Sequence, residues 1–185
     1  MMVLKMNKVK ILLDADVLIH LFKAENISLL QQLFPKRLIM LDVVLNELRS
    51  NTHINKNLDS IFLFSGIEEV VFPTSSNRTL LMEFIQLKKQ IGGSGECATL
   101  LYCKYNNHII ASSNTRDIVT YCTAHTISYL TTLDIFAIAI HRGLMTVDEV
   151  DVCITKITHN NGSHLCCISI QNHIQNHFVT QKYSF

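Results

Sequence analysis

Charged residues are scarce in this chain, making up 17% of its 185 residues, and the formal net charge is only +1. A protein with so little net charge has no basic field around the whole molecule, so a nucleic-acid partner would have to be held by local patches. The apolar fraction of 48% excludes an intrinsically disordered protein. We therefore expect one compact globular domain, with room for a small appendage.

Tryptophan is absent, and so is any Cys-x-x-Cys pair, which removes the support for a structural zinc site of that kind. A free thiol in an apolar helical segment packs as a small hydrophobic group. Four of the six cysteines have such surroundings: Cys97, Cys103, Cys122 and Cys153. The sequence contains neither the pattern of a signal peptide nor a long uninterrupted apolar run. We therefore expect a cytoplasmic protein in a reducing compartment, with no membrane association.

An apolar run near the start of the chain ends on two carboxylates. We expect a short buried strand over residues 10–13, because branched apolar residues bounded by a sharp change of polarity are typical of a central parallel strand. Asp14 and Asp16 follow at its carboxyl end, where open α/β sheets hold their ligands. Asp is depleted in strands and costly to bury unpaired. Asp16 alone could be the cap of a helix that begins near Val17; that role leaves Asp14 unexplained, and we predict a functional role for it.

Strands and helices alternate along the rest of the chain. The expected strands cover residues 38–41, 69–72, 108–112 and 127–130. The expected helices cover residues 26–34, a segment that begins at Asp42, and then 77–91, 96–105, 116–124, 133–141 and 146–157. Ser94 is expected to cap the helix that follows it, and residues 51–59 are expected to form a loop. The alternation predicts a parallel sheet flanked by helices.

Four acidic side chains stand at comparable places in this pattern: Asp14, Glu47, Glu96 and Asp117. Asp14 and Asp117 follow strands, whereas the two glutamates lie in the first turns of helices. In a parallel sheet these places converge at one edge, where clustered carboxylates raise one another's pKa unless a cation neutralises them. Mg²⁺ and Mn²⁺ prefer oxygen ligands, and such a site can activate water for phosphodiester hydrolysis. Taken singly, Glu47 also fits a solvated helix face, and Glu96 a partner of the helix dipole.

The same positions give the sequence a resemblance to the PIN-domain ribonucleases. The matching segments are residues 12–19 (Leu-Leu-Asp-Ala-Asp-Val-Leu-Ile), 45–48 (Leu-Asn-Glu-Leu), 95–98 (Gly-Glu-Cys-Ala) and 110–118 (Ile-Ala-Ser-Ser-Asn-Thr-Arg-Asp-Ile). The resemblance spans roughly residues 8–135 and depends on the order and spacing of the motifs. The family's first motif usually reads Asp-Thr-Asn or Asp-Ser-Asn, so Ala15 and Asp16 depart from it. Asn114 and Asp117 match its last motif, Asn-x-x-Asp.

The resemblance implies a fold, an activity and a partner. The fold would be a three-layer α/β/α sandwich with a central parallel sheet, in which residues 1–157 form a PIN-like nuclease domain and residues 158–185 a C-terminal extension of unknown structure. The activity would be metal-dependent endonucleolytic cleavage of RNA, with Mg²⁺ or Mn²⁺ as cofactor. Many members of the family are toxins of toxin–antitoxin pairs, so an antitoxin protein is a candidate partner; the extension departs from the shorter family toxins.

The resemblance also implies roles for particular residues. Asp14 would be the central metal ligand, and Asp117 would hold a second metal ion or an outer water. Glu47 and Glu96 would complete the catalytic site, Glu96 as a further metal ligand, or orient the attacking water. Asp16, Ser113 and Asn114 would support these groups by hydrogen bonding. Arg116, beside Asp117, is the expected contact to a phosphate of the nucleic acid.

Two other functions fit parts of the pattern. Asp14-Ala15-Asp16-Val17 also matches the nucleophile motif of haloacid-dehalogenase-like phosphatases, in which the first Asp attacks phosphorus and the second is the general acid/base, and Ser112 or Ser113 could be that family's second motif. That family also needs a downstream lysine and a late Gly-Asp pair, and this chain has no Gly-Asp dipeptide. The second alternative is a PIN-like fold with a weakened site, indicated by Ala15, that binds nucleic acid or protein without cutting.

The composition also favours one substrate over another. Duplex DNA would need many phosphate contacts along a positive face, and the lysines here are few and scattered. Unpaired RNA needs splayed bases and a few backbone contacts, for which the candidates are Arg116, Lys88, Lys89, Tyr102 and Tyr105. We further expect a homodimer, because residues 62–64 (Phe-Leu-Phe) and the last helices could expose apolar surface.

The tail after residue 157 is rich in Asn, His and Gln. Residues 165–170 are expected to form one strand or hairpin. Cys166, Cys167, His173 and His177 could bind zinc if the segment is helical, although adjacent cysteines seldom both reach one metal ion.

Overall fold

The computed structural model describes residues 9–50, 52–159, 165 and 169–176. Its centre is a five-stranded, all-parallel sheet with the strand order β3-β2-β1-β4-β5. The strands are β1 (Ile11–Leu13), β2 (Leu38–Leu41), β3 (Glu68–Val70), β4 (Ile109–Ala111) and β5 (Tyr129–Leu130). All five expected strands are present, most of them shorter than the sequence predicted.

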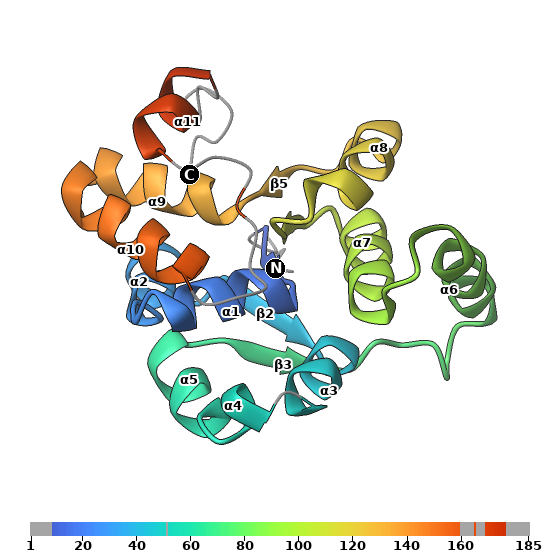
Figure 1. The fold of residues 1–185 in the computed structure, drawn as a ribbon. Helices are drawn as coiled ribbons and strands as arrows, with labels where there is room; N and C mark the ends of the chain where they lie inside the picture. Colours follow the sequence, from blue (N-terminus) through green and yellow to red (C-terminus); the bar gives the residue numbers. More distant parts are fainter. Residues whose placement is uncertain (1–8, 51, 160–164, 166–168, 177–185) are drawn as a thin grey trace, which may run out of the picture.

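Helices cover both faces of this sheet (Figure 1). They are α1 (Ala15–Lys23), α2 (Ser28–Leu33), α3 (Asp42–Ser50), α4 (Thr52–Asn55), α5 (Leu58–Ser65), α6 (Arg78–Ile91), α7 (Ser94–Asn106), α8 (Thr115–His125), α9 (Thr132–His141), α10 (Val147–His159) and α11 (Ile170–Asn176). In Figure 1, α1, α2, α9 and α10 gather on one side, and α3, α6, α7 and α8 on the other. The expected three-layer α/β/α architecture is confirmed.

Strand β1 is the centre of the core. It pairs with β2 through Ile11 and Leu12 and with β4 along its whole length. Ile11, Leu12 and Leu13 are completely buried, because helices cover this strand on both faces and burial of branched apolar side chains stabilises the fold. At the edge of the sheet, β3 instead exposes Glu68 and Glu69.

The sequence was wrong about residues 51–59, which were expected to form a loop. Helix α4 occupies residues 52–55, and α5 begins at Leu58. Three apolar side chains of this region, Ile54, Leu58 and Ile61, are buried, and α5 packs against α2. Burial of these side chains outweighs the weak helix propensity of the Asn- and Thr-containing segment.

Two smaller expectations were also wrong. Ser94 does not cap α7: it is the first residue of that helix, and Gly93 before it makes no side-chain cap. Ile170, expected in a strand or hairpin over residues 165–170, begins helix α11. Residues 166–168, which include Cys166 and Cys167 of the possible zinc site, lie outside the described part of the chain. So does His177 of the same site.

Helix α11 packs against α9 and α10. Its His173 is buried, and His173 Nε2 lies 2.9 Å from Asp134 Oδ1 at the start of α9. The structure therefore joins part of the C-terminal segment to the sheet's helical layer. None of the helices in the described ranges is long and apolar enough to cross a membrane.

Candidate active site

Asp14 and Asp16 lie where β1 turns into α1. Asp14 is the N-cap of the helix, and its Oδ1 accepts a hydrogen bond from the Ala15 amide at 2.8 Å. The capping role considered for Asp16 therefore belongs to Asp14. Asp14 is only 7% exposed, so its carboxylate is held at the carboxyl end of the central strand with little contact to solvent.

Asp16 connects α1 to the loop after β4. Its Oδ2 accepts a hydrogen bond from the Ser113 amide at 2.7 Å and lies 3.5 Å from the Ser112 hydroxyl. Its Oδ1 accepts a hydrogen bond from the Val17 amide. The structure thus gives Asp16 the hydrogen-bonding surroundings expected of a supporting residue.

Ser113 continues this network away from the site. Its hydroxyl lies 2.8 Å from Thr132 Oγ1 and accepts a hydrogen bond from the Thr132 amide at 3.0 Å. Thr132 Oγ1 in turn lies 2.9 Å from Nδ1 of the buried His20. Burial is the main reason that the pKa of His20 is lowered to about 4, so His20 is neutral near pH 7. The ends of β4 and β5 and helix α1 are therefore fixed to one another by uncharged groups.

Glu96 comes to the same place from the first turn of α7. It is 7% exposed, and its Oε1 is buried without a hydrogen-bond partner. An unpartnered buried carboxylate oxygen is costly. Helix α7 packs against α3, α6 and α8 and against the central strands. These packing contacts offset the cost of the unpartnered oxygen.

Asp117 and Asn114 lie at the start of α8. The Asn114 side-chain amide donates a hydrogen bond to Asp117 Oδ2 at 2.8 Å. Asp117 is half-buried, whereas Arg116 between them is exposed. Asn114 is thus a direct hydrogen-bond partner of one predicted metal ligand, as the sequence suggested.

The carboxylates perturb one another strongly. The pKa of Asp14 is raised to about 7, first by burial and then by the negative charge of Asp16. The pKa of Glu96 is raised to about 8 by burial, followed by the charges of Asp14, Asp117 and Asp16. Burial also raises the pKa of Asp16, against the opposing effect of amide hydrogen bonds from Ser113, Val17 and Asn114. These shifts mark a cluster of like charges with no lysine or arginine among its main influences.

Glu47 reaches the edge of this cluster from α3. Its side chain is exposed, and its Oε1 accepts a hydrogen bond from the Gly95 amide at 2.7 Å. Glu47 is the smallest of the influences on the Asp14 pKa. The structure therefore brings Asp14, Asp16, Glu96 and Asp117 together and places Glu47 beside them, bound to α7.

The donors fit a hard divalent cation in kind. Every carboxylate of the cluster offers oxygen ligands, which Mg²⁺ and Mn²⁺ prefer. Glu96 Oε1 could bind a cation without breaking a hydrogen bond, because it makes none. Among the residues that the structure describes, however, no three acidic, histidine or cysteine side chains have the arrangement of a ready-made metal site.

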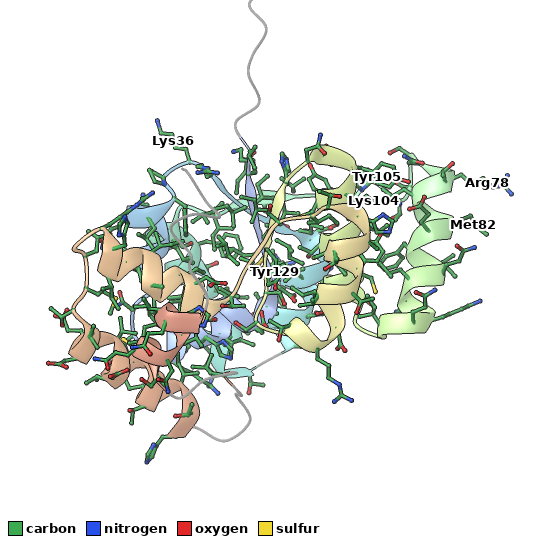
Figure 2. The ribbon with its side chains drawn as sticks, turned by 90° about the horizontal axis from the view of Figure 1, so that it is seen from above. Lys36, Arg78, Met82, Lys104, Tyr105 and Tyr129 are labelled. Atoms are coloured by element: carbon green, nitrogen blue, oxygen red, sulfur yellow. The ribbon has the colours of Figure 1, made fainter. Side chains whose placement is uncertain are left out.

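The aromatic side chains expected to help bind RNA lie elsewhere. Tyr105 is near the C-terminal end of α7 and donates a hydrogen bond to Glu83, and Lys104 binds the same carboxylate. Tyr105 lies nine positions after Glu96 in the helix, which is about 13 Å along the axis. Figure 2 shows Lys104 and Tyr105 beside α6, where Arg78 and Met82 point outward. Tyr102, which lies near the ring of His108, is in the same half of α7.

Sequence reasoning missed several of the residues that fix the carboxylates in place. Gly95, His20 and Thr132 were given no role at the site, and Ser112 was considered only for a phosphatase. Gly95 could have been suspected from its place between the loop and Glu96. The roles of His20 and Thr132 depend on contacts across 112 positions of the chain, and no local pattern reveals them.

Comparison with protein-family models and with curated proteins adds no relative. No protein-family model matches the sequence, and no curated protein matches it. The chemistry of the carboxylate cluster is therefore the basis on which the function must be argued.

Proposed function

We propose that this protein is a divalent-cation-dependent endoribonuclease that hydrolyses phosphodiester bonds of RNA. The observation that carries the proposal is the buried, unpartnered Glu96 Oε1 among the carboxylates of Asp14, Asp16 and Asp117. A structural carboxylate at such a depth would have a cation or a set of donors for both oxygens. A cluster of carboxylates with such an unpartnered oxygen is suited to binding a cation together with a phosphate substrate.

The residues have two kinds of role, to hold the cation and to support the site. Asp14, Glu96 and Asp117 would hold the cation, which when bound would neutralise their charge and supply an activated water. In the absence of a cation the pKa of Asp14 is raised to about 7, so we expect the site to bind the cation more tightly as pH rises and this proton is released. Asp16 keeps the Ser112–Ser113 loop against the site through its hydrogen bonds.

Unpaired RNA is the proposed substrate because the surroundings of the site carry little positive charge. Arg116 is exposed one residue before Asp117 and is available to contact a phosphate. Lys88 and Lys89, exposed in the last turn of α6, are further candidates. A few such contacts suit a single strand better than a duplex.

The partners remain predictions. Leu63 and Phe64 of α5 are 74% and 59% exposed, which favours the expected homodimer through this region. A role as a toxin would add an antitoxin whose tail approaches the acidic site.

The proposal is tested by incubating the purified protein with a labelled hairpin RNA and a labelled DNA duplex, with Mn²⁺ or Mg²⁺ and with EDTA. We expect cation-dependent cuts in the unpaired loop of the RNA, an intact DNA duplex, and loss of at least about 100-fold of the rate in Asp14→Asn. Asp148→Asn is the matched control, because Asp148 is an exposed acid in the first turn of α10.

Two results would redirect the assignment. Release of phosphate from small phosphomonoesters without RNA cleavage would favour the phosphatase alternative, for which the Ser112–Asp16 contact is the relevant geometry. Binding of RNA without cleavage, unchanged in Asp14→Asn, would favour the non-catalytic binding module.

A further inference from the structure

The contact between Glu47 and α7 is a helix cap supplied by another helix. The first amides of an α-helix have no partner within the helix, and at the start of α7 the N-cap Gly93 makes no side-chain cap. Glu47 Oε1 accepts the hydrogen bond of one of these amides, that of Gly95, at 2.7 Å. A carboxylate at a helix N-terminus is also favoured by the helix dipole.

Gly95 leaves no room for a side chain at this contact. A Cβ atom on Gly95 would lie 2.6 Å from Glu47 Oε2, 3.0 Å from Glu47 Cδ and 3.1 Å from Val44 Cγ2. These distances are shorter than van der Waals contact, so any other residue would push Glu47 off the helix end or move α7 away from α3. At Gly93, by contrast, a Cβ atom would meet its nearest neighbour, Glu96 Cβ, at an ordinary 3.5 Å.

Glu96 is the residue next to this contact, so the hydrogen bond of the Gly95 amide fixes the backbone from which the Glu96 side chain extends. Building on the proposed function, we propose that Glu47 is a positioning residue that holds Glu96 in the carboxylate cluster through the Gly95 amide, and that it is not a ligand of the cation. Gly95 is as necessary to this arrangement as Glu47, because its lack of a side chain permits the contact.

The electrostatics of the cluster agree with this division. The carboxylates that raise the Glu96 pKa most are those of Asp14, Asp117 and Asp16, and Glu47 is not among its main influences. One oxygen of the Glu47 carboxylate is already engaged by α7, and the side chain as a whole is exposed to solvent. Asp14 and Glu96 are buried.

Four variants separate positioning from ligation. Glu47→Gln keeps an oxygen that can accept the Gly95 hydrogen bond but removes the charge, whereas Glu47→Ala removes both. Gly95→Ala keeps every carboxylate and only fills the space between Gly95 and the Glu47 side chain. Gly93→Ala is the matched control, two residues away in the same loop with room for the methyl group. Circular dichroism and melting establish that each variant is folded, and Glu47→Ala provides the test without steric clash should Gly95→Ala not fold.

The first measurement is the pKa of Glu96 in the metal-free protein, from ¹³C NMR of its side-chain carboxyl. We expect it to stay raised in Glu47→Gln and Gly93→Ala and to fall toward the ordinary range of glutamate in Glu47→Ala and Gly95→Ala. An unchanged Glu96 pKa in both Glu47→Ala and Gly95→Ala would overturn the positioning role. This measurement needs neither cation nor substrate, so it stands even if the proposed function fails.

The second measurement is Mn²⁺ affinity by isothermal titration calorimetry, with cleavage of the hairpin RNA alongside. Loss of a positioning partner weakens metal binding by roughly 10- to 100-fold, which we expect for Glu47→Ala and Gly95→Ala. In Glu47→Gln the neutral amide still accepts the bond, about half as strongly, and we expect a Kd within about threefold of wild type. A loss in Glu47→Gln as large as in Asp14→Asn would make Glu47 a ligand. Absence of Mn²⁺ binding and cleavage in the wild type would reject the proposed function alone.

Discussion

Glu96 and Asp134 are two buried carboxylates in the first turns of helices, and their surroundings are opposite. They are 7% and 8% exposed, respectively. Asp134 Oδ1 faces His173 Nε2 at 2.9 Å, and its Oδ2 accepts hydrogen bonds from the amide and the hydroxyl of Thr131. Glu96 Oε1 has no partner, and carboxylates surround it.

The pKa values of the two acids move in opposite directions as a result. Burial alone would raise both. At Asp134 the hydrogen bonds from His173 and Thr131 outweigh burial and lower the pKa. At Glu96 the neighbouring negative charges add to burial and raise the pKa to about 8. Depth in the protein therefore does not distinguish a structural carboxylate from a candidate catalytic one; the partners do.

The largest difference between the two acids that we expect to measure is the loss of stability when Asp134 is replaced. Asp134→Ala removes the capping box of α9 and one hydrogen-bond partner of the buried His173, so the free energy of unfolding should fall by about 3 kcal/mol. Urea unfolding followed by circular dichroism measures the loss. Asp59→Ala, at an exposed acid in the first turn of α5, is the control. A fall of less than about 1 kcal/mol would mean that the pair contributes no more than a surface contact.

The next effect is the pH dependence of stability caused by Glu96. The fold keeps this carboxyl protonated up to about pH 8, whereas the unfolded chain releases the proton near its ordinary value of 4.5. The folded state therefore binds more protons, and the free energy of unfolding of the metal-free protein should fall as pH rises, by about 1.4 kcal/mol per unit. Between pH 6.5 and 8 Glu96 contributes a fall of roughly 2 kcal/mol, and Asp14, with a pKa of about 7, adds to it. His20 gives a small opposing rise near pH 6.5, where it is neutral in the fold but still partly protonated in the unfolded chain.

Variants of the two acids should separate in this window. Glu96→Gln should make the fall of stability with pH shallower, since the residue no longer titrates, and the fall that is left should come from Asp14, whose pKa of about 7 lies in the same window. Asp134→Asn should leave the slope unchanged, because a carboxyl of lowered pKa is ionised in both states above pH 6.5. Urea unfolding at a series of pH values measures both slopes. A wild-type stability that is flat between pH 6.5 and 8 would refute the raised pKa of Glu96.

The smallest effect that we expect comes from loss of the hydrogen bonds between the Thr131 hydroxyl and Asp134. Thr131 Oγ1 accepts a hydrogen bond from the Asp134 amide at 3.1 Å and donates to Asp134 Oδ2 at 2.9 Å. Thr131→Ala loses both bonds but keeps the bond from its backbone amide, so we expect a loss of about 1 kcal/mol and no change in the pH slope. Thermal unfolding and a separate urea titration measure this loss of stability. A change in slope would show that Thr131 also affects the carboxylate cluster.

Some features of the site could be predicted because they follow from local patterns. Apolar runs that end at Asp14 or shortly before Asp117, and helices that begin near Glu47 and Glu96, lead to the carboxyl edge of a parallel sheet whatever the details of packing. The carboxylate cluster was therefore predictable from the alternation of strands and helices. The short helices α4 and α5 were not, because buried Ile54, Leu58 and Ile61 stabilise them through tertiary contacts.

By itself, the sequence determined the order of the strands and helices and the edge of the sheet to which the acidic residues belong, because strand and helix periodicities are properties of neighbouring residues. Only the tertiary structure decided which acids have partners. His173 lies 39 positions from Asp134, and Glu47 lies 48 positions from Gly95. No local pattern encodes such contacts, since they depend on how the helices pack. Packing therefore completes the hydrogen bonding of Asp134 and leaves an oxygen of Glu96 unpartnered.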